Sequence, residues 1–236
     1  MQSKNGYVEF ELLSRCALLQ GLPPEVPLHL LAEGTSRRVE AKLVVFSRGD
    51  AGDEIYFLLS GGVKVSALSQ EGREIVFDVL VAPDLFGEVS LFDGRPRTGT
   101  VTTLVPSALL ILRKEHFLDL LASHPEVALR LLKTLASRLR MMDAFVEDVL
   151  FLDAEARLAK RVMALSRIFG RTGSNGEIRI DLKVSQQEMA NLVGITRESV
   201  NKHFRGWERS GSIGLEKGCL VLQQPSVIES LITEAV

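Results

Sequence analysis

The sequence predicts an α+β protein made of an antiparallel β-roll, a long helix and a C-terminal winged helix-turn-helix. Short apolar runs separated by glycine-containing turns occupy residues 35–112, a spacing typical of strands in a small roll or barrel. Residues 125–152 follow with no glycine and with proline only at the first position, which predicts one long helix. Near the end of the chain, two short helical patterns meet at Gly194 and precede a hairpin pattern.

Length and composition indicate a globular chain of two domains, since it has 236 residues and 46% hydrophobic content. The net charge is -2, with 16 basic and 20 acidic residues up to Leu152 and 12 basic and 10 acidic residues after it. This asymmetry is modest, so a nucleic-acid partner must be argued from the placement of charges. Without a signal-peptide pattern or a long apolar run, we expect a cytoplasmic protein that has no membrane partner.

The first part of the chain combines short helices with strands. Residues 1–33 have helical segments that we expect Pro23, Pro24 and Pro27 to interrupt, and the run Phe10–Leu19 has helical spacing. Apolar runs then predict strands at 43–46, 55–59, 63–68, 75–80, 101–104 and 108–112. We expect these strands to form a pocket, as small rolls do.

Two segments inside the roll, Leu85–Leu91 and Arg95–Thr98, do not have a plain strand pattern. Gly87 permits close backbone approach, and a short helix starting at Glu88 would direct its free amides toward one anion. Arg97 would add a guanidinium beside those amides, and the Glu88 carboxylate suits a ribose hydroxyl. The alternative is a surface Gly-Glu turn with an unrelated arginine. We favour the anion site because the whole set lies within a glycine-punctuated roll.

The predicted helix at 125–152 would be about 42 Å long. Along it, apolar residues recur at alternating intervals of three and four, which is the spacing of a coiled-coil seam. The seam residues are Leu132, Leu135, Leu139, Met142, Val146 and Val149. Leu131 and Phe145 supply a second stripe for contact within the chain. We therefore predict a homodimer rather than a buried intramolecular helix, and domains at 1–124, 125–152 and 153–236.

The helix-turn-helix prediction depends on local signals. Ser185 and Glu188 have the spacing of a capping box, Gly194 ends the first helix, and Thr196 caps the second. The exposed side of the second helix is expected to present Arg197, Glu198, Asn201 and Lys202. The alternative is an ordinary helical hairpin with a solvated charged face. We favour DNA binding because the charges cluster at the N-terminal end, where side chains reach base edges.

The segments around this motif complete the winged helix. A helix is expected at Glu155–Phe169, a polar loop at 170–176 and a strand at Ile178–Leu182. Ser212–Leu215 and Cys219–Leu222 flank a turn and predict a β-hairpin.

The combined order of these motifs resembles the catabolite-activator/fumarate-nitrate-regulator (CRP/FNR) family of bacterial transcription regulators. The motifs are Phe86-Gly87-Glu88, Pro96-Arg97-Thr98, Phe151-Leu152-Asp153 and the segment Gly194–Lys202, and the resemblance covers nearly the whole chain. It implies that Glu88 binds the ribose, and Arg97 with Thr98 the phosphate, of a cyclic nucleotide. The implied ligand set is Gly87, Glu88, Val89, Arg97, Thr98, Met142 and Asp143. cAMP is the favoured effector, cGMP is the runner-up, and a ligand-independent regulator is a third possibility.

The resemblance also implies dimerisation through the long helix, ligand-driven repositioning of the DNA domains, and a palindromic duplex DNA operator. RNA polymerase is a further possible partner. The implied DNA-binding residues are Ser185, Gln186, Thr196, Arg197, Glu198, Ser199, Asn201 and Lys202.

The sequence departs from some members of the family. Cys16 stands alone where iron-sulfur members carry a set of cysteines, and the histidines show no arrangement that marks an axial ligand, so we expect neither a cluster nor haem. Met142 and Asp143 occupy positions where cAMP-binding relatives place small polar residues, which leaves the nucleobase open. No catalytic constellation is visible, so we expect no enzymatic activity.

Overall fold

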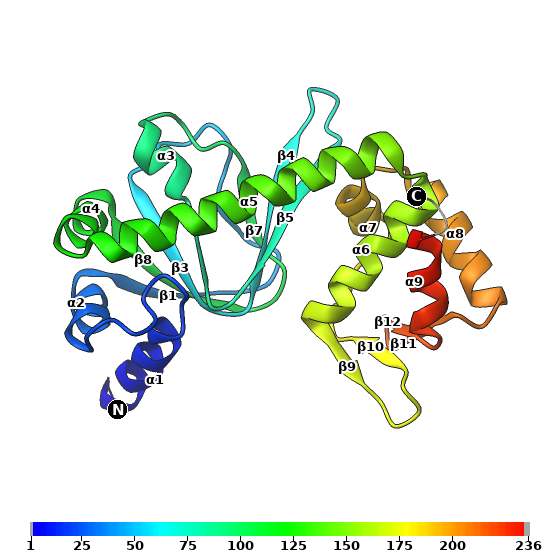
Figure 1. Cartoon of the computed structure of the whole chain (residues 1–236), viewed down its shortest axis with the longest axis horizontal. Helices are drawn as coiled ribbons and strands as arrows, with labels where there is room; N and C mark the ends of the chain where they lie inside the picture. The colour runs from blue at the N-terminus through cyan, green and yellow to red at the C-terminus, as the bar shows by residue number, and fades with distance from the viewer. Residues whose placement is uncertain (1, 234–236) are drawn as a thin grey trace. The chain divides into compact units, whose positions relative to one another are not determined.

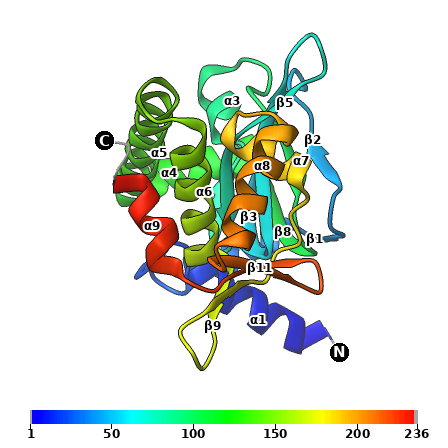
Figure 2. The ribbon, with the colours of Figure 1, turned by 90° about the vertical axis from the view of Figure 1, so that its right-hand side faces the viewer.

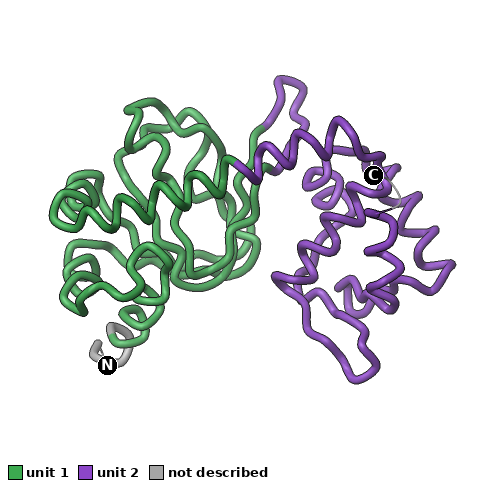
Figure 3. Tube along the Cα trace, viewed as in Figure 1, with its two compact units in different colours: residues 1–67, 77–139 green, residues 68–76, 140–236 purple. Residues whose placement is uncertain are grey.

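The computed structural model describes residues 2–233, and its side chains from Tyr7 onward. Met1 and residues 234–236, which the predicted domains include, lie outside the described part. Two compact units make up the chain: residues 1–67 with 77–139, and residues 68–76 with 140–236 (Figure 3).

The first unit is built around two four-stranded sheets with strand orders β1-β8-β3-β6 and β2-β7-β4-β5 (Figure 1). The strands are β1 Thr35–Val39, β2 Val44–Phe46, β3 Glu54–Ser60, β4 Gly62–Leu68, β5 Glu74–Val81, β6 Asp84–Phe86, β7 Thr100–Thr103 and β8 Ser107–Arg113. All six predicted strands are present. The roll is therefore confirmed.

Two strands of the roll were not predicted from the sequence. β1 is exposed along its first four residues, so it has no apolar alternation to recognise. β6 has only three residues, two of which, Leu85 and Phe86, we expected outside plain strands. That expectation was wrong, because pairing with β3, such as Phe86 opposite Tyr56, makes this short segment a strand.

The helices of this unit are α1 Gln2–Ser14, α2 Glu25–Glu33, α3 Glu88–Asp93, α4 Lys114–Ser123 and the first part of α5 Pro125–Phe151. α1 ends at Ser14, short of the predicted Leu19. Pro27 does not interrupt α2 but lies in its first turn, where a proline removes only an N–H that has no helical partner. The ten-residue α4 follows β8 directly.

The main apolar core of the first unit lies between these helices and strands β3 and β8. Phe57 and Phe117 are fully buried there, with ring centroids 6.2 Å apart. Leu131 is also buried in this core. Of the second apolar stripe predicted on the long helix, Leu131 therefore packs within the chain, while Phe145 is half-buried. Leu135, predicted for the dimer seam, also packs partly against this core.

The second unit contains the rest of α5, α6 Ala154–Phe169, α7 Gln186–Val193, α8 Arg197–Arg209 and α9 Pro225–Thr233. A four-stranded sheet has the order β11-β12-β10-β9, with β9 Gly170–Thr172, β10 Ile178–Ile180, β11 Ile213–Glu216 and β12 Cys219–Leu222. Figure 2 shows α7 beside α8, with the β11–β12 hairpin after the end of α8. The winged helix-turn-helix is therefore confirmed.

Two features of this unit differ from the sequence prediction. The segment at 170–176, expected as a polar loop, begins with strand β9, which pairs antiparallel with β10. Its exposed residues carry no apolar signal, so only the pairing reveals the strand. α9 was not predicted, and it packs on α6. Of the helices within residues 2–233, none combines the length and apolar composition that crossing a bilayer requires.

Candidate functional site

The first candidate site begins at Gly87, the N-cap of α3. Its φ of +90° lies in the left-handed region, and a Cβ added there would come within 2.8 Å of Nη1 of Arg97. Both the backbone conformation and the close approach require glycine. As predicted, a short helix starts at Glu88.

Arg97 is the central cation of this site and is only 3% exposed. Its Nη1 donates to the carbonyl of Gly87 and its Nη2 to the carbonyl of Glu54, both at 2.7 Å. The guanidinium carbon lies 4.3 Å from the ring centroid of Phe46 and 5.7 Å from that of Tyr56. The remaining donor, Nε, is buried and has no hydrogen-bond partner among the described residues. A buried donor of this kind is suited to an anionic acceptor.

Glu88, expected as an acceptor for a ligand hydroxyl, also forms an ion pair. Its side chain is 5% exposed, and its Oε1 accepts a 2.6 Å hydrogen bond from Nη1 of Arg138 on α5. Nη2 of Arg138 also donates to Oδ1 of Asp84 at 3.1 Å and to the carbonyl of Leu85 at 2.5 Å. The hydrogen bonds of the described residues use only Oε1 of Glu88, so Oε2 remains for a ligand hydroxyl.

Arg138 and Asp84 were not predicted as site residues, although the sequence carries one signal for Arg138. Arg138 lies two helical turns after Leu131, on the stripe of α5 that was assigned to contact within the chain. A long cation on an inward stripe has to find buried acceptors, and here it finds two carboxylates and a carbonyl.

Burial and charge pairing both shift the pKa values of Asp84 and Arg138. Burial raises the pKa of the Asp84 carboxyl, while the Arg138 guanidinium opposes that shift. Burial disfavours the charged form of Arg138, but Glu88 and Asp84 outweigh this effect, so the pKa of Arg138 is raised. Arg138 therefore stays charged and holds Glu88 in place.

The remaining predicted ligand residues lie in two places. Val89 is exposed on α3, and Thr98 is exposed next to Arg97. Met142 and Asp143 lie about one turn further along α5 than Arg138, in the part of the helix that belongs to the second unit. Their role in the site stays a prediction.

The second candidate site is the helix-turn-helix, and its local geometry follows the sequence closely. Ser185 Oγ accepts from the Glu188 amide at 3.1 Å, and Glu188 Oε2 accepts from the Ser185 amide at 2.7 Å. Gly194 ends α7 with φ +73°, and Thr196 Oγ1 accepts from the Ser199 amide at 3.1 Å. The capping box, the glycine turn and the second cap are all confirmed.

α8 presents one charged face and buries the other. Val200, Phe204 and Trp207 are buried, and Nε1 of Trp207 donates to Oε1 of Glu155 on α6 at 2.8 Å. Side chains at the N-terminal end of the exposed face are Arg197, Glu198 and Lys202.

Asn201 differs from the prediction. It is half-buried rather than fully exposed, and its Oδ1 accepts a 3.4 Å hydrogen bond from Nε2 of Gln186. Its neighbour α7 supplies this partner. We therefore keep Asn201 as a positioning candidate and not as a free base reader.

A β-roll followed by a winged helix-turn-helix is the architecture of a class of DNA-binding regulators. The chain matches the family model of the cyclic nucleotide-binding domain at residues 36–124 and that of the Crp-like helix-turn-helix domain at residues 156–231. It is 34% identical over 206 residues to the CRP-like cAMP-activated global transcriptional regulator of Mycobacterium tuberculosis, a match that covers 87% of this chain and 92% of that protein. The chain belongs to the CRP/FNR family of transcription regulators.

Other relatives agree with this assignment. The global nitrogen regulator of Synechocystis is 31% identical, over 80% of this chain and 84% of that protein. The solved structure of the c-di-GMP responsive global regulator CLP of Xanthomonas campestris aligns with a TM-score of 0.74 at 24% identity, covering 85% of this chain and 99% of that one, and it supports the fold alone. The protein is thus a DNA-binding transcription regulator with a cyclic nucleotide-binding domain, and not an enzyme.

Proposed function

We propose that this regulator is a homodimer whose binding to palindromic DNA is controlled by cAMP, with cGMP as the alternative effector. The observation that carries the proposal is the buried guanidinium of Arg97, whose Nε has no partner among the described residues. A cyclic phosphate that leaves water needs a charged partner, and this donor meets that need. The name of the Mycobacterium tuberculosis relative, a cAMP-activated regulator, supports the choice of cAMP.

The ribose and phosphate halves of the nucleotide have assigned partners in this proposal. Glu88, fixed by Arg138, accepts from a ribose hydroxyl through Oε2, while Gly87 and Val89 provide the backbone around the phosphate. Thr98, exposed beside Arg97, adds a hydroxyl to the phosphate. If no ligand shifts the equilibrium between conformations of the protein, the same fold would act as a ligand-independent regulator. This is the remaining alternative.

The base half of the nucleotide is assigned to Met142 and Asp143. A carboxylate at 143 would accept from the adenine amino group, or from the two adjacent donors of guanine. Thr98 is a second candidate contact for guanine. Asp143 therefore governs the choice between cAMP and cGMP in this proposal.

Calorimetric titration of the full chain with cAMP and cGMP tests the effector. We expect cAMP to bind more tightly than cGMP, and Asp143→Asn to weaken binding of the preferred nucleotide about tenfold, because a charge-assisted hydrogen bond is lost. Glu147→Gln, a similar change at an exposed site on the same helix, is the control and should bind like the wild type. Failure of the wild-type protein to bind either nucleotide would rule out the sensor assignment.

DNA recognition is assigned to the N-terminal end of α8. Arg197 reads guanine, Glu198 accepts from cytosine N4, and Lys202 contacts guanine less strictly than an arginine would. Ser185, Gln186, Thr196 and Ser199 contact phosphates or position the helices. Two such helices in a dimer predict half-sites about 10 base pairs apart, resembling TGTGA and TCACA. At regulated promoters, RNA polymerase is the expected protein partner.

Arg197→Ala tests the base-reading role. We expect it to cost roughly 1–3 kcal/mol on the specific operator and to relax preference at one base pair, because a bidentate contact to guanine is lost. Fluorescence anisotropy with operators substituted at single positions, and with random duplexes, measures both effects. Arg209→Ala, at the other end of α8, is the control. An equal loss on random DNA would instead make Arg197 a phosphate contact.

A further inference from the structure

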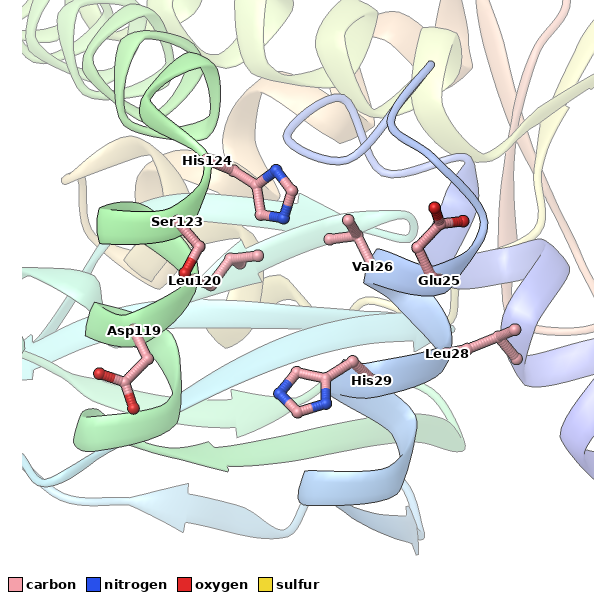
Figure 4. Close-up of a pocket in the computed structure, with 8 residues that line it drawn as sticks. All are labelled: Glu25, Val26, Leu28, His29, Asp119, Leu120, Ser123 and His124. Atoms are coloured by element: carbon pink, nitrogen blue, oxygen red, sulfur yellow. The ribbon is translucent and has the colours of Figure 1, made fainter.

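The groove between α2 and α4 lies outside both sites, and it belongs to the packing of the first unit (Figure 4). Val26 and Leu120, which line it, are buried members of the core of that unit. These apolar side chains are already used by the fold, so we assign the groove no binding role. A polar contact in the second unit, between α6 and α8, is the stronger candidate for a function that the two sites do not include.

Glu155 of α6 accepts the indole proton of Trp207 on α8. The Nε1–Oε1 distance is 2.8 Å, and Nδ1 of His203, about one turn earlier on α8, lies 3.5 Å from the same oxygen. Trp207 is 5% exposed, whereas the Glu155 side chain is 39% exposed. The carboxylate therefore lies at the edge of the α6–α8 contact and faces two consecutive turns of α8.

The start of α6 determines where this carboxylate lies. Asp153 caps the helix, because its Oδ1 accepts from the Ala156 amide at 2.8 Å. Glu155 belongs to the first turn that this cap orders, where the free amides of the helix also stabilise a carboxylate. The ordered backbone thus holds the acceptor of the indole N–H in one place.

Apolar packing alone does not set the rotation of α8 about its own axis. The buried face of α8 consists of Val200, Phe204 and Trp207, and contacts between apolar side chains have no preferred direction. The hydrogen bond to Glu155 does have one, since a bond bent below about 120° weakens steeply. A rotation of α8 by about 15° would move side-chain tips about 6 Å from its axis by about 1.5 Å, which is more than a hydrogen bond to a base edge tolerates.

We propose that Glu155 is a positioning residue for DNA recognition, which sets the rotation of α8 through Trp207. Trp207 lies near the opposite end of α8 from Arg197, about 15 Å away along the helix, so Glu155 acts on the base-reading end without reaching it. A carboxylate suits this role because its hydrogen bonds are stronger than those of a neutral acceptor. The proposal rests on the assignment of base reading to the N-terminal end of α8, and it is independent of the effector.

The first test compares DNA specificity among variants of the full chain, with cAMP and cGMP both present. Fluorescence anisotropy gives the ratio of affinities for a duplex that the wild-type protein selects from a random pool and for a shuffled duplex. We expect Glu155→Ala to lower this ratio about tenfold, because a rotated helix loses base contacts, while affinity for the shuffled duplex stays within about twofold. Glu155→Gln keeps an acceptor oxygen and should restore the ratio to within about threefold of the wild type.

The second test observes the hydrogen bond itself. Trp207 is the single tryptophan of the chain, so one indole N–H resonance reports its environment. We expect this proton to exchange with water faster in Glu155→Ala and at about the wild-type rate in Glu155→Gln. Trp207→Phe keeps a buried ring without the donor, so it should lower the specificity ratio as well, and combining it with Glu155→Ala should lower the ratio no further. If Glu155→Ala does not fold, Trp207→Phe and Glu155→Gln decide the question.

Glu229→Ala is the matched control, because it removes a carboxylate of the same unit that lies 3.4 Å from Arg167 of α6. It should keep the wild-type specificity ratio. An equal loss in this control would indicate a general effect of charge or stability and would overturn the proposal. A wild-type ratio in folded Glu155→Ala or Trp207→Phe would also overturn it, because the hydrogen bond would then stabilise the domain without setting the recognition helix.

Discussion

Replacing Arg97 with alanine is expected to abolish cyclic nucleotide binding, with affinity reduced at least about 100-fold. The cyclic phosphate would enter a buried site without its charged partner, a loss of roughly 3–5 kcal/mol. Titration calorimetry with cAMP and cGMP measures the effect. The expectation is large because Arg97 is buried and stacked on Phe46, so water cannot replace its guanidinium.

Arg97 also has a structural role, which determines the design of this experiment. Its guanidinium holds the carbonyls of Glu54 and Gly87, so the alanine variant leaves two acceptors without their donors. Arg97→Lys keeps the positive charge but cannot reproduce both hydrogen bonds, and it should retain part of the affinity that alanine loses. Arg95→Ala removes an exposed arginine two residues away and serves as the control.

Thermal unfolding separates the two roles of Arg97. A folded Arg97→Ala protein that no longer binds either nucleotide would agree with the phosphate assignment. Wild-type affinity in that folded variant would contradict it, and the partnerless Nε would then have no functional meaning.

Placing two glutamates on the seam of α5 is expected to produce monomers. Leu139 is 64% exposed and Val146 is 54% exposed, and the seam residues Leu132 and Val149 are exposed as well, so the seam leaves a row of apolar side chains uncovered. In a dimer, Leu139→Glu/Val146→Glu would bring four carboxylates into one apolar interface, which repel one another and lose their water. Analytical ultracentrifugation measures the change.

A matched control distinguishes this interface from a general effect of charge. Ser137→Glu/Arg140→Gln changes the net charge by the same amount at exposed positions off the seam, and it should remain a dimer. If the double glutamate variant sediments as a dimer, the seam is misassigned. If the wild-type protein is itself a monomer, the homodimer proposal fails.

The sequence predicted most of the architecture because the signals for it are local. The caps formed by Ser185 and Thr196 join residues three apart, and Gly194 ends a helix through its own backbone. The period of the long helix and the turns of the roll are likewise patterns over short distances. The strands β6 and β9 were not predicted, because each has three residues and no apolar alternation. They are recognised only from their pairing, β6 with the distant strand β3 and β9 with the next strand, β10.

The sequence by itself determined that Gly87, Glu88 and Arg97 belong to one candidate site, and that α8 is the second helix of the helix-turn-helix. Only the tertiary structure decided which hydrogen-bond partners those groups have. Arg138 reaches Glu88 across 50 positions of sequence, and Arg97 reaches the carbonyl of Glu54 across 43. No periodicity or spacing encodes such pairs, because they depend on which acceptors lie within a few ångströms once the chain has folded and excluded water.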